Sequence, residues 1–211
     1  MAHAATIVAD ANTKLWNATA DEHDPISTRT FGFWLYMMSD GLIFASLFAS
    51  YAVLDGPMNA AGHPMAAQLL SASQGMVQTI LILASVLALS VGTLSIKTGN
   101  KAGVSLGLLL AALLAVVFLF IGSSDLAAMT AAGNGATASA YLSVLFTLII
   151  THGLHMGFGL LWMAVLLVQI ARSGFTTAVV GRLLCLRMFW QFQASVWVIV
   201  YVYVYLFGGA H

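Results

Sequence analysis

Five long apolar segments, separated by short polar stretches, make up most of this 211-residue chain. They cover residues 31–54, 75–96, 102–121, 140–171 and 183–207. A helix needs about 20 consecutive apolar residues to cross the roughly 30 Å hydrocarbon core of a membrane. Only 7% of the residues are charged, whereas a soluble domain carries about 25%. The sequence therefore predicts an all-α fold, a polytopic membrane bundle of five transmembrane helices.

The first 30 residues have a different composition from the rest of the chain. They contain four carboxylates and no hydrophobic period, so we expect a polar N-terminal arm at 1–30 and one membrane domain at 31–211. The arm has no apolar core of the kind that a cleavable signal peptide requires.

The seven lysines and arginines are distributed asymmetrically along the chain. Two precede the first segment, two lie between the second and third, and three lie between the fourth and fifth or in the first turns of the fifth. Loops 55–74 and 122–139 carry none. Because basic residues gather on the cytoplasmic side, the N-terminus should be cytoplasmic and the C-terminus periplasmic.

The zero net charge offers no surface for nucleic acid, and the single cysteine, Cys185, excludes an internal disulfide.

The stretch THGLHMGFGLLW at 151–162 concentrates the features of a packing helix. His152 and His155 are three residues apart and fall on one helical face. Gly153 and Gly157 form a GxxxG pair, and Gly159 adds a third position without a side chain. We therefore expect the helix at 140–171 to be a buried packing hub.

Two further strips of small residues recur at every fourth position, a spacing that favours close helix contact. The third segment carries the strip Gly103, Gly107, Ala111 and Ala115, and the first segment carries Gly41, Ala45 and Ala49.

The two histidines of 140–171 are poor candidates for a metal or haem site. A haem held between helices needs an axial ligand on a second helix, and the other four histidines lie in the arm, in a loop and at the C-terminus. No acidic or sulfur partner stands at ligand spacing for zinc or copper. We expect both imidazoles to make hydrogen bonds between helices.

The other polar side chains of the segments fit the same interpretation. Asp40 is the only carboxylate within the expected spans and should face protein, either paired or protonated. Buried amides donate and accept hydrogen bonds without changing charge. The intramembrane amides are Gln78, Gln169, Gln191 and Gln193. Arg182 and Arg187 lie near the cytoplasmic end of the fifth segment, where they should contact lipid head groups.

No catalytic triad, phosphate loop or paired-carboxylate motif occurs, so the chain is expected to have no catalytic residues and to bind no cofactor by itself. A small-solute or proton transporter is the alternative, but five segments do not divide into two equal repeats. A membrane anchor carrying a b-type haem is a third possibility, which the histidine count disfavours.

Three stretches resemble a known family. FGFWLYMMSD at 31–40, continuing into FASYAVL at 48–54, THGLHMGFGLLWMAVLLVQIAR at 151–172 and FWQFQASVW at 189–197 resemble subunit III of the haem–copper oxidases. Within that family, the five segments are most similar to the short subunit III of bacterial cytochrome o-type ubiquinol oxidases. The resemblance covers segments one, four and five well, and segments two and three mainly by hydropathy and position.

The resemblance implies a non-catalytic accessory subunit of a proton-pumping ubiquinol:oxygen oxidoreductase in an aerobic respiratory chain of the bacterial inner membrane. Haems and copper would belong to a partner subunit I, and ubiquinol would be the substrate of the complex. Subunit II, a small subunit IV and phospholipids would be further partners. The positions that match the family, Asp40, His152, His155, Trp190 and Trp197, would pack helices or contact lipid. With the amides and arginines above, the candidate set is Asp40, Gln78, His152, His155, Arg182, Arg187, Trp190, Gln191 and Trp197.

The chain departs from the family pattern at several ionisable positions. The last helix of relatives often reads WHxxDxxW, whereas this chain has Gln191 and Ala194 at the two ionisable positions. Gln78 stands where the second helix often carries a glutamate, and Asp125 is the only acid left at the outer end of the third segment. Amides still form hydrogen bonds, so a role in packing survives these changes.

Overall fold

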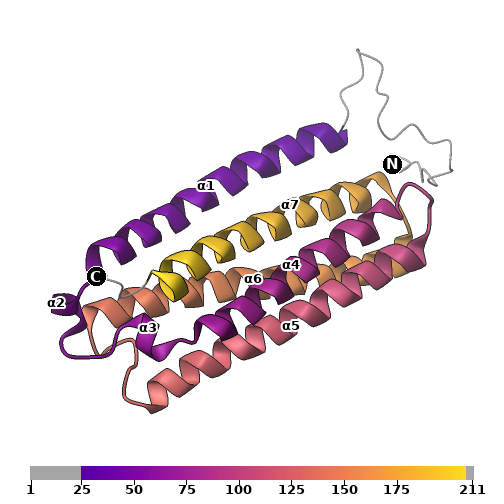
Figure 1. Ribbon diagram of the computed structural model, residues 1–211. Helices are drawn as coiled ribbons and strands as arrows, with labels where there is room; N and C mark the ends of the chain where they lie inside the picture. The colour runs from indigo at the N-terminus through magenta and orange to yellow at the C-terminus, as the bar shows by residue number, and fades with distance from the viewer. Residues whose placement is uncertain (1–24, 208–211) are drawn as a thin grey trace.

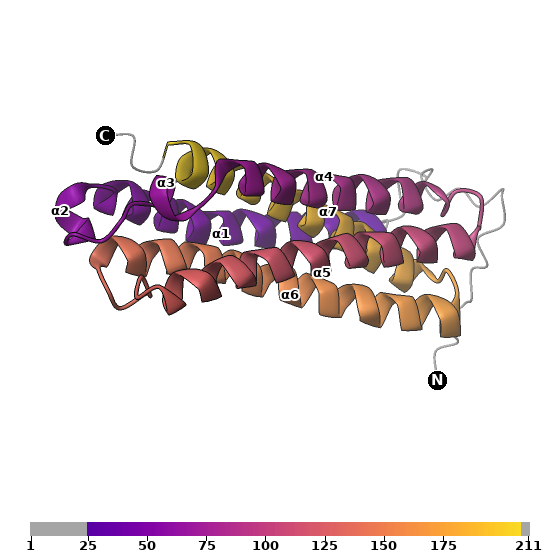
Figure 2. The same cartoon turned by 60° about the horizontal axis from the view of Figure 1, so that its bottom comes forward.

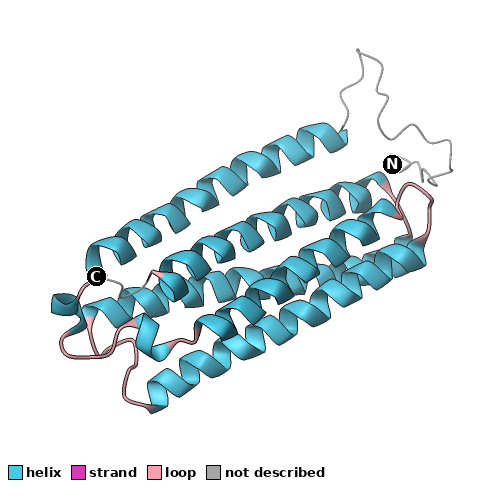
Figure 3. Ribbon diagram, in the orientation of Figure 1, coloured by secondary structure: helices cyan, strands magenta, loops and turns pink. Residues whose placement is uncertain are grey.

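The computed structural model describes residues 25–207 and contains only helices and connecting loops over that range (Figure 3). The five long helices are α1 (Pro25–Leu54), α4 (Ala72–Leu94), α5 (Lys101–Ala131), α6 (Ala140–Ser173) and α7 (Thr177–Val200), and a π-helix, η1 (Tyr201–Leu206), continues α7. Two one-turn helices, α2 (Pro57–Ala60) and α3 (Ala66–Leu69), lie in the loop after α1 (Figure 1). All five long helices are long and apolar enough to cross a membrane, which confirms the predicted bundle. The expected arm falls mostly on residues 1–24, outside the described range.

Side-chain caps set where three of the helices begin. Asn100 accepts a hydrogen bond from the Gly103 N–H at the start of α5. Ser139 caps α6 through the Leu142 N–H, and Thr176 caps α7 through the Val179 N–H. Each cap satisfies one of the free N–H groups that a helix start leaves without an intrahelical partner. The link between α6 and α7 is therefore only residues 174–176, and α7 begins six residues before the predicted position 183.

The third helix extends ten residues past its predicted end at 121. Gly122, Ser123, Ser124 and Asp125 indicated a loop in the sequence, but all four continue α5. The serine hydroxyls donate to backbone carbonyls three residues earlier, so the helix itself satisfies them. The prediction that Asp40 is the only carboxylate within a span is therefore wrong, because Asp125 lies within α5.

The most enclosed helix is α7, which packs against α1, α4 and α6 (Figure 1). In its most apolar stretch 56% of the residues are buried, compared with 28% for α6, so the expectation that the helix at 140–171 is the buried one is wrong, although α6 also contacts three long helices. α6 contacts α1, α5 and α7 but exposes a long apolar face, including Leu154, Phe158 and Leu161. Figure 2 shows α4 and α5 running side by side, and this is the most closely packed pair in the bundle.

Two glycines bring α4 and α5 together. A methyl group added at Gly107 would lie 2.5 Å from the Gly92 Cα and 2.9 Å from the Ala88 carbonyl oxygen. Ala111 and Ala115, further along the same strip, are fully buried. The strip at 103–115 therefore packs as predicted. In the strip of the first segment only Gly41 lies against another helix within residues 25–207, beside the Phe192 ring of α7, whereas Ala45 and Ala49 are exposed on α1.

Candidate functional site

The polar side chains of the spans lie mainly where two helices meet, and the clearest pair joins α1 to α6. The His155 Nε2 lies 3.0 Å from the Asp40 Oδ1, and its Nδ1 lies 2.8 Å from the Thr151 carbonyl oxygen. A carbonyl oxygen only accepts, so Nδ1 carries a hydrogen. Nε2 then either accepts from a protonated Asp40 or, on a doubly protonated ring, donates to a carboxylate. In both states the pair has no net charge, which limits the cost of placing it in a membrane.

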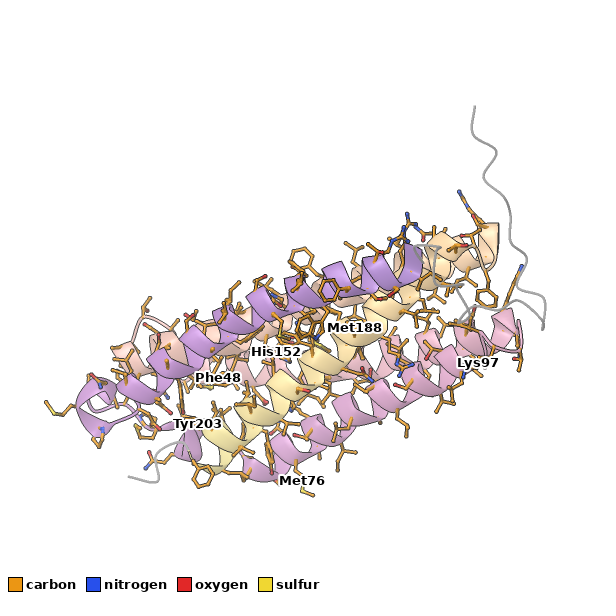
Figure 4. All side chains as sticks on the ribbon, turned by 90° about the horizontal axis from the view of Figure 1, so that it is seen from above. Phe48, Met76, Lys97, His152, Met188 and Tyr203 are labelled. Atoms are coloured by element: carbon orange, nitrogen blue, oxygen red, sulfur yellow. The ribbon has the colours of Figure 1, made fainter. Side chains whose placement is uncertain are left out.

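His152 occupies a different environment from His155, although both project from α6. It is 1% exposed, and its ring nitrogens make no well-aligned hydrogen bond among the described residues, although the Gln193 side chain of α7 lies close enough to interact with the ring. Its ring packs against Phe44, Phe118 and Trp197, with centroid distances of 6.3, 5.9 and 5.5 Å. Figure 4 shows it near the middle of the bundle's length. The expected hydrogen bond between helices therefore stays a prediction for His152, with Gln193 of α7 as the partner within reach.

Two tryptophans of α7 attach that helix to α4. The Trp190 Nε1–H donates to the Ser85 Oγ at 2.7 Å, and this hydroxyl donates to the Ala111 carbonyl of α5 at 3.0 Å. The Trp197 Nε1–H donates to the Thr79 Oγ1 at 3.1 Å. Hydrogen bonds of this type between membrane helices contribute about 0.6–2 kcal/mol each. The two hydroxyl partners, Ser85 and Thr79, were not predictable from the sequence, because α4 carries several other serines and threonines.

Asp125 joins α5 to α4 through two amides. The Gln74 Nε2 donates to the Asp125 Oδ1 at 2.6 Å, and the Gln78 Nε2 donates to the Asp125 Oδ2 at 2.9 Å. Gln78 is fully buried, and the Tyr205 side chain of η1 lies close enough to interact with it. This contact between α4 and α5 is made by Asp125, which was predicted to lie in the loop at 122–139.

Replacing Asp125 with alanine should therefore destabilise the bundle more than replacing it with asparagine. Alanine leaves the buried Gln78 amide without its acceptor, at a cost of about 1–3 kcal/mol, and also removes the acceptor of the half-buried Gln74 amide. Asparagine keeps one acceptor oxygen. Thermal dissociation of the purified protein in detergent measures the difference, and equal midpoints for the two variants would contradict the assigned contact.

A pair of tyrosines joins α1, α3 and α6 at the end of the bundle where α1 ends and α6 begins. The Tyr51 and Tyr141 hydroxyls lie 3.0 Å apart, and the Tyr141 hydroxyl accepts from the Ala66 N–H at 3.0 Å. Both rings are completely buried. Tyrosines at segment ends usually indicate membrane-interface anchors, which is why sequence reasoning did not place them in the core.

The remaining candidate residues lie near the surface of this chain. Arg182 is exposed and donates to the Gln169 Oε1 at 2.9 Å, across the short link between α6 and α7. Arg187 is half-buried beside Lys97. Gln191 is exposed on α7, so it does not join helices within the described chain.

The glycine of α6 that allows a close helix contact is Gly159, not the predicted pair Gly153 and Gly157. A methyl group at Gly157 would meet nothing within 4 Å among the described residues, and one at Gly153 would meet only Leu119, at 3.8 Å. A methyl group at Gly159 would lie 2.5 Å from the Trp190 ring. The close approach between α6 and α7 therefore occurs at Gly159, where the Trp190 indole of α7 occupies the space that a side chain would take.

Residues 25–207 contain no group of three histidine, cysteine, aspartate or glutamate side chains close enough to hold a metal ion. His152 and His155 have no third ligand beside them, and the nearest carboxylate, Asp40, is already paired. These residues do not fit a haem or a copper centre.

Comparison with known proteins identifies the family of this chain. A sequence model of the family described as cytochrome c oxidase subunit III matches residues 17–209. The chain belongs to that family. Its relatives include the cytochrome bo(3) ubiquinol oxidase subunit 3 of Pseudomonas putida, which is 38% identical over 88% of this chain and 89% of the relative. The corresponding protein of Pseudomonas aeruginosa is 39% identical over 89% of this chain and 88% of its own length. The cytochrome c oxidase subunit 3 of Bacillus sp. strain PS3 is 32% identical over 84% of each chain.

As a member of the subunit III family with five spanning helices, the chain is a multi-pass membrane protein. The family resemblance noted in the sequence is confirmed, and the family match extends across all five helices.

Proposed function

We propose that this chain is the non-catalytic accessory subunit III of a proton-pumping ubiquinol:oxygen oxidoreductase in the respiratory chain of a bacterial inner membrane. The relatives named cytochrome bo(3) ubiquinol oxidase subunit 3, matched over almost their full length, are the observation that carries the proposal. Haems and copper would reside in the partner subunit I. Subunit II and a small subunit IV complete the expected assembly.

The surface of α1 supports a role in assembly. Large apolar side chains are exposed along the whole helix, including Phe31 at 63%, Leu42 at 72% and Val53 at 78%. In a membrane such a surface contacts lipid tails or another helix, and the exposed small residues Ala45 and Ala49 would permit a close helix neighbour. We therefore assign packing on the catalytic subunit and phospholipid contact to the outer faces of the bundle.

The positions of the basic residues support an N-terminus in the cytoplasm. The Arg29 Nη1 donates to the Ala178 carbonyl at 3.3 Å, so the starts of α1 and α7 lie at one end of the bundle. Lys101 lies beside Gly174, at the same end. Basic residues on one side of a membrane protein mark its cytoplasmic side.

Isolation through an affinity tag on this chain tests the proposal. In mild detergent the chain should copurify with a haem-bearing subunit, and the eluate should show a Soret band and ubiquinol-dependent oxygen consumption. A haem-free homo-oligomer that transports a solute or protons in vesicles would contradict the assignment.

A further inference from the structure

The end of the bundle where α1 begins carries a positive charge that no carboxylate within residues 25–207 neutralises. Six basic side chains lie there, on or beside all five long helices, and Figure 4 labels one of them, Lys97, at this end. They are Arg29, Lys97, Lys101, Arg172, Arg182 and Arg187. Of the described carboxylates, Asp40 pairs with His155, and Asp55 and Asp125 lie beyond the middle of the bundle, toward its other end.

Three of these cations surround the first turns of α1 and are called the basic cluster here: Arg29, Lys97 and Arg187. Ile26, Lys97 and Arg187 line one hollow between α1, the end of α4 and α7. The Arg29 Nη1, about one turn further along α1, donates to the Ala178 carbonyl at 3.3 Å. Among the described residues no carboxylate forms an ion pair with any of the three cations. Because Arg187 is half-buried beside Lys97, their positive charges repel each other in a partly desolvated place, and a nearby anion would stabilise both.

The remaining carboxylates of the chain come directly before this cluster in the sequence. Four of the seven acids precede α1, namely Asp10, Asp21, Glu22 and Asp24. Asp24 is adjacent to the first residue of α1, where a negative charge stabilises the start of a helix. Asp21 and Glu22 are five and four residues before Ile26, and five extended residues span at most about 18 Å. Both carboxylates can therefore reach the hollow that Ile26 lines.

The size of the hollow favours a side-chain carboxylate over a phospholipid head group. The hollow encloses about 60 Å³, roughly the volume of two water molecules. A carboxylate group is of that size, whereas a phosphodiester with its glycerol is larger. The covalent link to α1 also keeps the acids beside the cluster at an effective concentration on the order of millimolar, which a free anion would have to exceed.

We propose that residues 21–24 dock on the basic cluster, with the Asp21 and Glu22 carboxylates pairing with Lys97 and Arg187. Docking joins the segment before α1 to the end of α4 and to α7, so it fixes the start of α1 against the bundle. Three carboxylates then offset three cations. This inference goes beyond the proposed function, which assigns no role to residues 21–24. A lipid head group, expected at Arg187 from the sequence, is the competing occupant.

Cleavage by a glutamyl endopeptidase tests the docking in the intact purified complex. Glu22 is the only glutamate of the chain, so the release of residues 1–22, followed by mass spectrometry, reports on this segment alone. Docking hides the bond after Glu22, so at low ionic strength cleavage should be slower than in a free peptide of residues 15–30. About 0.5 M salt screens ion pairs near the surface and should speed cleavage several-fold relative to that peptide. A rate equal to that of the peptide at low ionic strength would overturn the proposal.

Two variants test the assigned cations. Lys97→Gln and Arg187→Gln should each raise the cleavage rate about two- to fivefold, because each removes one partly exposed ion pair. Arg172→Gln is the matched control, since it removes the same charge from the same end of the bundle but lies on α6, outside the cluster. Its rate should match that of the unmodified complex. Equal rates for Arg172→Gln and Arg187→Gln would contradict the docking, and the salt dependence of the unmodified complex decides if a variant fails to assemble.

Photolabelling separates the segment from a lipid. A phosphatidylglycerol with a diazirine in its head group should label residues 93–97 and 184–187 of the unmodified complex only weakly, because residues 21–24 cover them. Strong label at both places that Arg187→Gln removes would assign the cluster to a lipid phosphate and refute the docking. Neither readout depends on oxidase activity, so a failure here leaves the proposed function unaffected.

Discussion

Gly107→Ala should push α4 away from α5 and markedly lower the stability of the bundle. The added methyl group would meet backbone atoms of Gly92 and Ala88 at 2.5 and 2.9 Å, and backbone cannot move aside as a flexible side chain can. Overpacking of this kind costs about 1–3 kcal/mol, and Gly107→Leu should cost more. The thermal dissociation midpoint of the purified complex measures the effect.

Gly122→Ala provides the control for Gly107→Ala, since it adds the same methyl group to the same helix with no contact closer than 3.9 Å. Its midpoint should stay near that of the unmodified protein. Equal midpoints for Gly107→Ala and Gly122→Ala would show that α4 and α5 do not pack through the glycine pair.

Asp40→Ala should weaken the attachment of α1 to α6, whereas Asp40→Asn should preserve most of it. Alanine leaves the His155 Nε2 without its 3.0 Å partner, at a cost of about 1–2 kcal/mol. The asparagine amide can still donate to a neutral imidazole whose Nδ1 hydrogen points to the Thr151 carbonyl. Limited proteolysis in the loop after α1, together with the dissociation midpoint, measures the loosening. Equal losses in both variants would mean that the contact depends on a charge rather than on a hydrogen bond.

The number of spans was predictable from the sequence because lipid imposes a minimum length on each apolar segment. The ends of α5 and α7 were harder to predict. Polar residues such as Ser123 and Asp125 indicate a loop when they are read singly, yet here the helix backbone and two glutamines of α4 satisfy them. Thr176 caps α7 early, which moved its start into a region that was expected to be a link.

The identity of the central helix was not predictable for a different physical reason. In lipid, the exposed and buried faces of a helix are equally apolar, so hydropathy does not distinguish α6 from α7. The glycine pattern of α6 suggested close packing at Gly153 and Gly157, whereas the indole of Trp190 occupies the space beside Gly159. Which small residues receive a neighbour depends on bulky side chains from another segment, and a single segment does not specify them.

The partners of the candidate polar residues were only partly predictable from the sequence. Asp40 was expected to need a partner, and its partner is His155. His152, one turn away, was expected to behave in the same way, yet aromatic rings enclose it and the polar side chain beside it is the Gln193 amide of α7 rather than a carboxylate. Spacing along a helix gives the shared face but not the side chains that the neighbouring helices place opposite it.

The central claim is that the polar groups of this chain hold helices together and do not move protons or electrons. The most direct test is the rate of ubiquinol-dependent oxygen consumption, with the number of protons translocated per electron, in the intact complex carrying Asp40→Asn. Asparagine keeps a hydrogen bond to His155 but cannot exchange a proton, so both quantities should match those of the unmodified complex. A large loss of either quantity, in a complex with its full haem content and unchanged subunit composition, would contradict the claim.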